Sequence, residues 1–208
     1  MRLQAIRKPT TTSERRLIDQ MHELRARIFR DRLGWSVQCI GDREYDAFDE
    51  LDPTYILAIS SQDSVVGCAR LLPATGRTML EDVFPQLLRD GGLSAHEAMI
   101  ESSRFCADTG NAQGREGGTV NDITLWMFAG IVDWCRARGY TEIATATDVR
   151  LERILRRIGW PMRRIGDAIM INETRSVAGV LPADEASFAR LRPNAYRSDF
   201  ACLQMHAA

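Results

Sequence analysis

Charged residues of both signs are spaced along the first half of the chain in a way that can build a buried ion-pair cluster. They are Arg25, Glu44, Asp46, Asp49, Arg70 and Arg104. Arg70 and Arg104 fall inside or at the edge of apolar segments, where an unpaired charge is costly to bury and needs a carboxylate partner. We therefore expect the three arginines to bind the three acids and to order the acidic segment. The alternative is an acidic loop exposed to solvent after an amphipathic helix.

Glu101 is a second candidate for chemistry, because it lies within an apolar segment that predicts a strand. Its neighbours on the same face of that strand are Met99, Ser103 and Phe105. Strand interiors disfavour glutamate, so the carboxylate is either paired for structural reasons or retained for proton transfer, and the sequence leaves both open. An apolar setting would raise the pKa of this carboxyl and improve it as a general base.

Composition narrows the class of protein. The chain has 208 residues and a formal net charge of −1, so its bulk charge indicates neither nucleic acid nor an anionic membrane as a partner. Its five cysteines form no CxxC pair, and its three histidines lack metal-ligand spacing, so we expect neither a disulfide scaffold nor a metal centre. The sequence shows no signal-peptide core and no apolar run of membrane length, which predicts a cytoplasmic protein.

The elements that must position these residues alternate between strands and helices. Strands are predicted over residues 2–6, 55–60, 65–72, 98–106, 142–147, 162–165 and 168–172. Helices are predicted from a cap at Ser13 to Phe29 and over residues 84–89, 120–138, 149–158 and 183–190. Residues 30–53 read as a long ordered loop. This order predicts an α/β protein, a single domain over residues 1–208, built as a three-layer α/β/α sandwich around a mixed sheet.

The spacing of residues from Leu24 to Asp49 resembles the signature of the LuxI-type autoinducer synthases. The matching run is Leu24-Arg25-x3-Phe29-x2-Arg32-x2-Trp35-x-Val37-x6-Glu44-x-Asp46-x-Phe48-Asp49. The other matching positions are Arg70, Phe84, Glu101-Ser102-Ser103-Arg104-Phe105 and Gly159-Trp160-Pro161. The resemblance covers essentially the whole chain and fits best the TraI-type branch of that family.

This resemblance implies a fold similar to the GNAT acetyltransferases and two substrates, S-adenosylmethionine and an acyl chain on acyl carrier protein. The implied products are an N-acyl-homoserine lactone for quorum sensing, methylthioadenosine and the free carrier protein. No cofactor is implied, because S-adenosylmethionine is consumed as a substrate. Some members of the family use acyl-CoA, which is the alternative donor.

The resemblance also suggests a role for each candidate residue near the reacting groups. The catalytic candidates are Glu101, as the base that deprotonates the amine, with Arg104, Glu44, Asp46 and Asp49. The candidates for binding S-adenosylmethionine are Arg25, Phe29, Trp35, Arg70, Phe84, Arg104 and Phe105. Among these, Phe29 and Trp35 are expected to form a wall beside the adenine and the sulfonium cation.

The acyl chain and its carrier have candidates of their own. The acyl-chain candidates are Thr145, Leu125, Met127, Phe128 and Ala146. Thr145 matches a position that is often threonine in family members favouring 3-oxoacyl chains, so a 3-oxoacyl chain is expected; the alternative is an ordinary strand threonine. The candidates for docking an acidic carrier protein are Arg150, Arg153, Arg156 and Arg157. The alternative for that basic stretch is a solvated helix face.

Two other functions stay open from the residues. An ordinary GNAT-type N-acyltransferase would need a pyrophosphate-binding turn for its CoA donor, and only near misses occur, at Gln38-x-x-Gly41 and Arg136-x-x-Gly139. A non-enzymatic module that holds an acyl chain would need neither the polar cluster nor Glu101. Detection of methylthioadenosine after incubation with S-adenosylmethionine and acyl donors distinguishes the synthase from both.

Overall fold

The computed structural model describes residues 1–89, 91–108 and 121–200. By internal contacts the chain divides into two compact units, each assembled from separate parts of the sequence. Unit 1 comprises residues 1–70, 104–131 and 192 onward, and unit 2 comprises residues 71–103 and 132–191. The single domain expected over residues 1–208 stays a prediction.

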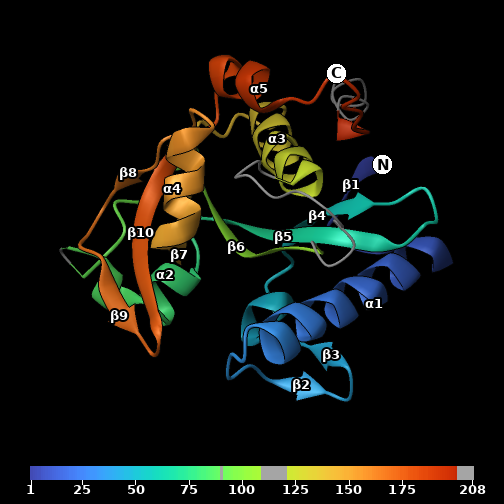
Figure 1. Ribbon diagram of the computed structural model, residues 1–208, viewed down its shortest axis with the longest axis horizontal. Helices are drawn as coiled ribbons and strands as arrows, with labels where there is room; N and C mark the ends of the chain where they lie inside the picture. Colours follow the sequence, from blue (N-terminus) through green and yellow to red (C-terminus); the bar gives the residue numbers. More distant parts are fainter. Residues whose placement is uncertain (90, 109–120, 201–208) are drawn as a thin grey trace. The chain divides into compact units, whose positions relative to one another are not determined.

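A mixed sheet of eight strands runs through the chain in the order β1-β4-β5-β6-β7-β10-β8, with β9 paired to β10 (Figure 1). Its strands are β1 (Arg2–Ile6), β4 (Thr54–Ile59), β5 (Val65–Pro73), β6 (Met99–Ala107), β7 (Glu142–Asp148), β8 (Arg163–Arg164), β9 (Ile169–Ile171) and β10 (Thr174–Pro182). β1 pairs antiparallel with β4, whereas β6 pairs parallel with β7, so the sheet is mixed as predicted.

The remaining elements are helices, helical turns and one small hairpin. They are α1 (Thr12–Ala26), the π-helical turn η1 (Arg27–Arg32), the hairpin β2 (Cys39–Ile40) and β3 (Arg43–Glu44), the 3₁₀ turn η2 (Ala47–Glu50), α2 (Met79–Asp82), the 3₁₀ turn η3 (Pro85–Leu87), α3 (Asp122–Arg136), α4 (Val149–Arg157) and α5 (Glu185–Leu191).

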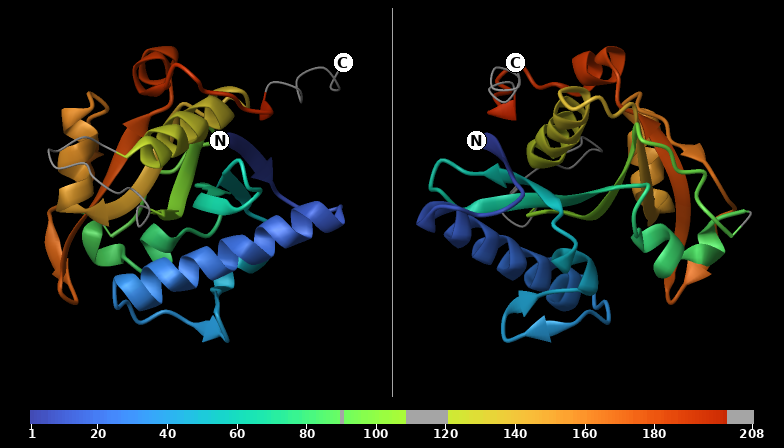
Figure 2. Two further views of the ribbon diagram at one scale, coloured as in Figure 1. Left: turned by 45° about the vertical axis from the view of Figure 1, so that its right-hand side comes forward. Right: turned by 180° about the vertical axis from the view of Figure 1, so that it is seen from behind.

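In unit 1, β4 is buried along its whole length because helices cover both faces of the sheet (Figures 1 and 2). Leu57 on one face joins an apolar cluster with Leu17 and Met21 of α1. On the other face, Gly130 of α3 lies so close to the sheet that a Cβ there would be 2.3 Å from Leu3. This close approach requires glycine and seats α3 directly on β1.

In unit 2, β7 and β10 form an antiparallel ladder from Ser176 opposite Asp148 to Pro182 opposite Glu142. Apolar side chains of these strands pack with those of α2 and η3, including Leu80 and Leu87. α4 also contacts β7 and β10. Each unit therefore places helices against the sheet, as a layered α/β fold requires.

Several local predictions need correction. α1 is capped by Thr11, not Ser13, because Thr11 and Glu14 form a reciprocal capping box. The segment over residues 30–53 is not one loop but contains η1, the hairpin and η2. The helix predicted over residues 84–89 is only the short turn η3, and α2 before it was not predicted. The predicted start of α3 at residue 120 lies outside the described residues.

β10 was the largest omission. Its first residues are polar, and Gly179 weakens the strand pattern. The structure explains that glycine, since a Cβ at Gly179 would be 2.4 Å from the Met162 side chain. β10 forms a strand because it pairs with β7 on one side and β8 on the other, and not because its residues favour strands.

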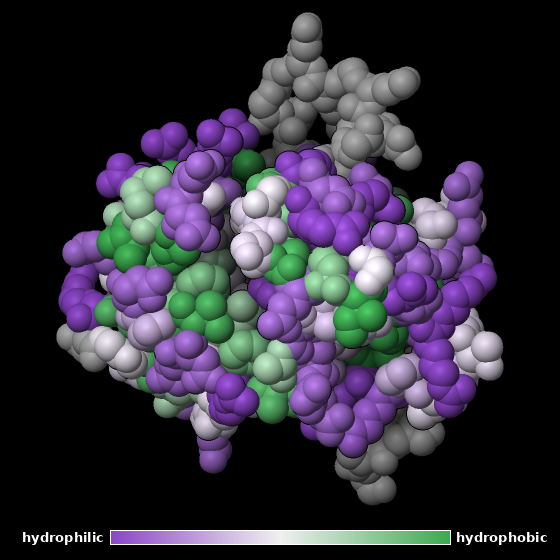
Figure 3. Space-filling view, turned by 90° about the horizontal axis from the view of Figure 1, so that it is seen from below, coloured by the Kyte–Doolittle hydropathy of each residue, from purple (hydrophilic) through white to green (hydrophobic). Residues whose placement is uncertain are grey.

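No helix in the part of the chain that the structure describes is both long and apolar enough to cross a membrane. The face in Figure 3 carries clusters of hydrophobic side chains bordered by hydrophilic ones. Ile40 and Met170 are the most exposed large apolar side chains of the described residues, and they lie in unit 1 and unit 2 respectively.

Candidate functional site

Six side chains of unit 1 form a connected network of ion pairs. Its members are Arg25, Arg70, Arg104, Glu44, Asp46 and Asp49. Nη1 and Nη2 of Arg25 donate to the two carboxylate oxygens of Asp49 at 2.8 and 2.9 Å, the bidentate geometry that makes the strongest pairs. The charge-balanced cluster predicted from the sequence is confirmed.

Each acid of the network binds two of the arginines. Asp49 also accepts from Arg70 at 2.9 Å, and Asp46 pairs with both Arg70 and Arg104. Glu44 accepts from Arg25 at 2.5 Å and from Arg104 at 3.0 Å. The side chains of Arg25, Arg70 and Glu44 are fully buried, so this sharing compensates charges that water does not reach.

The acidic segment is ordered by its own backbone as well as by the arginines. Asp46 caps η2 by accepting from the Phe48 N–H at 2.9 Å, while the Asp46 N–H donates to Asp49 at 2.9 Å. This reciprocal pair is a capping box on a 3₁₀ turn. The Phe48 ring lies 5.4 Å from the Arg70 guanidinium, within the range of a cation–π contact.

The network changes the pKa of its buried members. Burial alone would raise the pKa of Asp49, but hydrogen bonds and charge from Arg25, followed by the charge of Arg70, hold it well below its usual range. Burial alone would lower the pKa of Arg25, whereas Asp49 and Glu44 raise it above its ordinary value. Both side chains are therefore charged at neutral pH.

Two residues that the sequence analysis missed, Tyr55 and His22, form hydrogen bonds with acids of the network. The Tyr55 hydroxyl donates to Asp49 at 2.6 Å, and burial, followed by the Asp49 charge, raises the pKa of Tyr55. Nδ1 of His22 lies 2.8 Å from the Glu44 carbonyl oxygen. His22 precedes Arg25 by three residues on α1, so helical spacing was the one signal available for it.

An aromatic pair stands beside the network. The rings of Phe29 and Trp35 are stacked, with centroids 5.3 Å apart and planes 2° apart. The π-helical turn η1 and Gly34, at φ 65°, bring the chain back so that the Trp35 N–H donates to the Phe29 carbonyl at 2.8 Å. The Arg104 guanidinium lies 5.7 Å from the Phe29 ring. In this stack Trp35 stays 42% exposed, while Phe29 is buried.

Arg104 owes its position to an unusual backbone conformation. Its φ is 51°, in the left-handed region that non-glycine residues rarely adopt, and it lies inside β6. The simple alternation of faces predicted along residues 98–106 therefore does not continue through this residue. Phe105, the next residue, stacks on Phe128 of α3 with centroids 5.0 Å apart.

In unit 2, Glu101 is buried with 1% of its surface exposed. Its two carboxylate oxygens accept from the backbone N–H groups of Met79 and Leu80 at 2.9 and 2.7 Å. The sequence left open whether this carboxylate is paired for structural reasons or retained for proton transfer. The structure adds two donors at the start of α2, which stabilise the ionised carboxylate.

Thr145 lies where the parallel pairing of β6 and β7 stops. The ladder ends at Glu101 opposite Ala144, and the Thr145 hydroxyl donates to the Ser102 carbonyl at 2.8 Å. The one hydroxyl hydrogen of Thr145 is therefore already donated to a protein acceptor. Ala146 and Phe84 are partly buried against the apolar cluster of unit 2.

The other acyl-chain candidates belong to α3 in unit 1. Met127 is fully buried and contacts Gly67, where a Cβ would be 3.0 Å from it, so Met127 fills the core. Phe128 is buried and stacks on Phe105. Leu125 is partly buried.

The arginines of α4 differ from those of the network. The four arginines of α4 are all exposed: Arg150, Arg153, Arg156 and Arg157. Within the described residues, no ion pair involves them, whereas neighbouring Arg164 binds Glu152 at 2.5 Å. Asp148 caps the helix by accepting from the Leu151 N–H at 2.7 Å.

Known proteins resemble this chain over nearly all of its length. The family description "Autoinducer synthase" matches residues 10–191. A probable acyl-homoserine-lactone synthase of Sinorhizobium fredii is 57% identical over 198 residues, covering 95% of this chain and 95% of the relative. This rhizobial relative is consistent with the TraI-type branch.

Solved structures agree with the fold. TofI, crystallised in a ternary complex with an inhibitor and MTA, is 28% identical, with a TM-score of 0.77 over 92% of this chain and 96% of that one. BjaI, a CoA-dependent acyl-homoserine lactone synthase solved with SAM and isopentyl-CoA, has a TM-score of 0.82 over 99% of each chain. At 20% identity BjaI is evidence for the fold alone. The predicted GNAT-like α/β/α fold is confirmed.

A family match across most of the sequence and a relative more than half identical show the family. The protein is therefore an acyltransferase, an acyl-homoserine-lactone synthase by class, and the chain belongs to the autoinducer synthase family.

Proposed function

We propose that the enzyme transfers an acyl chain from acyl carrier protein to the amine of S-adenosylmethionine and then closes the lactone, releasing methylthioadenosine. The observation that carries this proposal is the stack of Phe29 and Trp35 beside a rigid, charge-balanced network. An aromatic face attracts a sulfonium cation by about 0.5–2 kcal/mol. The TofI complex with MTA supports a substrate that contains this nucleoside.

In acyl transfer a neutral amine attacks the thioester carbonyl; the C–N bond forms as the C–S bond breaks, and the carrier leaves as its free thiol. An α-amino group with a pKa near 8 is largely protonated at neutral pH, so a base must remove its proton directly or through water. Glu101 is our candidate, because its carboxylate is buried and fixed in position by two backbone N–H donors. A positioned base of this kind contributes roughly 10²–10⁴-fold to the rate.

Lactone closure follows without a second base. The methionyl carboxylate attacks its own γ-carbon; the C–O bond forms as the C–S bond breaks, and the sulfur leaves with the electron pair as a neutral thioether. The protein mainly has to hold the chain folded, which is a proximity effect. The side chains of Arg25 and Arg70 are fully buried in ion pairs of the network. Arg104 is partly exposed, so it is the arginine that we propose for binding the substrate carboxylate.

Glu101→Gln tests the base. Glutamine keeps one acceptor oxygen for the two backbone donors, so we expect a folded protein whose kcat falls by at least about 10². The limb of the pH–rate profile that reports the base should disappear. Near-normal turnover by the folded variant would remove Glu101 from the reaction.

The donor is proposed to be acyl carrier protein because the four arginines of α4 are exposed and leave their charge available to an acidic partner. Acyl-CoA is the competing donor. Purified enzyme incubated with S-adenosylmethionine and the same acyl chain on either carrier should give a higher kcat/KM with the protein carrier. Equal or better use of acyl-CoA would reject the carrier assignment, and absence of methylthioadenosine with every donor would reject the synthase mechanism.

The acyl chain is proposed to be 3-oxoacyl, with Thr145 as the discriminating residue. Since its hydrogen is donated to Ser102, the hydroxyl must turn to meet a 3-oxo group, and we expect modest discrimination. Thr145→Val should reduce the preference for 3-oxoacyl over unsubstituted donors by about fivefold, which corresponds to roughly one hydrogen bond. An unchanged preference would leave Thr145 a structural role only.

A further inference from the structure

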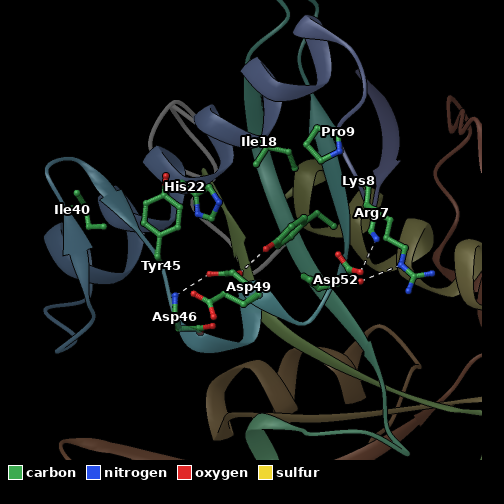
Figure 4. Close-up of a pocket in the computed structure, with 13 residues that line it drawn as sticks. Arg7, Lys8, Pro9, Ile18, His22, Ile40, Tyr45, Asp46, Asp49 and Asp52 are labelled. Carbon is green, nitrogen blue, oxygen red and sulfur yellow. Dashed lines mark hydrogen bonds and ion pairs between the residues drawn. The ribbon is translucent and has the colours of Figure 1, made fainter.

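A hollow of about 460 Å³ lies in unit 1 behind the acidic segment, within the size range of small-molecule sites (Figure 4). Its apolar lining includes Pro9, Ile18, Ile40 and Pro53, and the rings of Tyr45 and Tyr55. Of the candidate residues named above, only Asp46 and Asp49 line this space. Its lining favours a ligand with an apolar part.

Four charged side chains around the hollow, Lys8, Asp46, Asp49 and Asp52, are paired with opposite charges, whereas Glu50, which also lines it, has no ion pair within the described residues. Lys8 pairs with Asp52 at 2.8 Å, and Arg7 donates to the Asp52 carbonyl at 3.2 Å. Asp46 and Asp49, which also line the hollow, are bound by the arginines of the network. An ionic ligand would have to compete with these pairs, so the site favours a neutral molecule.

One ring nitrogen of a buried side chain at the hollow has no hydrogen-bond donor within the described residues. His22 lines the hollow and is only 5% exposed. A carbonyl oxygen only accepts, so Nδ1 of His22 must carry the hydrogen it shares with Glu44. Burial, and then the charge of Arg25, lowers the pKa of His22, so the ring is neutral at pH 7. Nε2 is therefore an acceptor, and no donor to it occurs among the described residues.

The His22 ring is also held in place. Tyr45, which lies next to it in Figure 4, stacks on the ring with centroids 3.9 Å apart, and Tyr55 meets it edge-on with centroids 6.3 Å apart. The Nδ1–H bond leads directly to Glu44, whose carboxylate binds Arg25 and Arg104. A ligand on Nε2 would thus touch a residue that supports the network.

We propose that this hollow binds a neutral amphipathic amide, whose N–H donates to Nε2 of His22 and whose apolar chain lies along Ile18 and Ile40. N-acyl-homoserine lactones have this chemistry, so the site is suited to feedback by the product; this last step rests on the proposed function. Occupancy then acts on the ion-pair network through the Glu44 carbonyl.

The test uses full-length enzyme labelled with ¹⁵N-histidine, which contains three histidines. Titration with N-hexanoyl-homoserine lactone in the presence of saturating methylthioadenosine should shift the Nε2 resonance of His22 and leave exposed His96 unchanged. The N-methylated analogue, which lacks the donor, should bind about tenfold more weakly. Absence of a His22 shift at millimolar lactone, or equal affinity of both compounds, would overturn the proposal.

Two variants locate the site. Ile18→Trp should fill the hollow and weaken binding at least tenfold at unchanged basal turnover, and Val83→Trp, at an exposed position in unit 2, is its matched control. If Ile18→Trp misfolds, Ile40→Glu at the exposed rim should also weaken binding. Unchanged affinity in a folded variant would reject the site.

N-butylhexanamide is an amide without the lactone ring. It distinguishes a site for the lactone product from a site for any neutral amide. Tighter binding of the lactone supports product feedback, whereas equal binding refutes feedback specific to the product and retains an amide site. Turnover is assayed separately: an enzyme that makes lactone but shows no His22 response refutes this inference alone. Binding at His22 without any lactone synthesis would instead refute the proposed function.

Discussion

Two sets of arginines, one in each unit, behave in opposite ways. In unit 1, the side chains of Arg25 and Arg70 are 0% exposed and are surrounded by carboxylates. In unit 2, the four arginines of α4 are exposed, and none has an ion pair within the described residues. The first set is part of the core, while the second leaves its charge facing solvent.

Desolvation explains the difference. Removing one partner of a buried pair leaves an uncompensated charge and costs about 3–5 kcal/mol. An exposed arginine contributes about 0–1 kcal/mol to stability, but its field acts on approaching partners. Mutations in the network should therefore change stability, and mutations on α4 should change association.

The largest effect is expected for Arg25→Ala. Loss of the guanidinium leaves Glu44 and Asp49 buried with fewer partners, so the free energy of unfolding should fall by about 3–5 kcal/mol. Denaturant titration measures this, with Arg153→Ala as the exposed control, which should change stability by less than about 0.5 kcal/mol. Similar losses in both variants would contradict the contrast between the units.

Acid should weaken the network through Asp49. Its pKa is lowered in the folded protein, so its contribution is complete above the unfolded pKa of about 3.9 and is lost as the pH falls toward the folded value. A paired aspartate of this kind contributes roughly 2.6 kcal/mol at neutral pH. Denaturant titrations from pH 7 to 3 should show a steeper acid loss for the wild type than for Asp49→Asn. Parallel profiles would show that Asp49 is not the group responsible.

Tyr55→Phe should have an intermediate effect. The variant removes one hydrogen bond to the Asp49 carboxylate. Asp49 still has its ion pairs with Arg25 and Arg70. We expect a loss of about 1.5 kcal/mol, measured by thermal or denaturant unfolding. Tyr140→Phe in unit 2 is the control, and an equal loss there would show that the Asp49 bond is not special.

The smallest effect on stability is expected for reversal of charge on α4. Arg153→Glu with Arg157→Glu should leave the free energy of unfolding within about 0.5 kcal/mol of the wild type. KM for acylated carrier protein should nevertheless rise several-fold at low salt, and the difference should shrink as ionic strength increases. Reversal of Arg175, exposed on β10, is the matched control. An unchanged KM would place docking elsewhere.

The network was predictable from the sequence because burial imposes a simple rule on charge. Arg70 and Arg104 in apolar strands need carboxylates, and together with Arg25 they equal in number the three acids of the segment from Glu44 to Asp49. The support by His22 and Tyr55 was not predictable, since each depends on one contact across the fold. Glu101 was found as a buried acid, but its partners are backbone N–H groups, which every residue except proline carries and no side-chain pattern reveals.

The sequence by itself determined the family, the order of most elements and the set of charges that must neutralise one another, because spacing and burial rules act locally. Only the tertiary structure decided how those charges are shared, how Arg104 leaves the regular strand at a positive φ, and where β10 finds its partners. It also decided that the Thr145 hydrogen is already used and that Nε2 of His22 is free of described donors. These features depend on the direction of individual hydrogen bonds between residues far apart in the chain, which residue type and spacing do not specify.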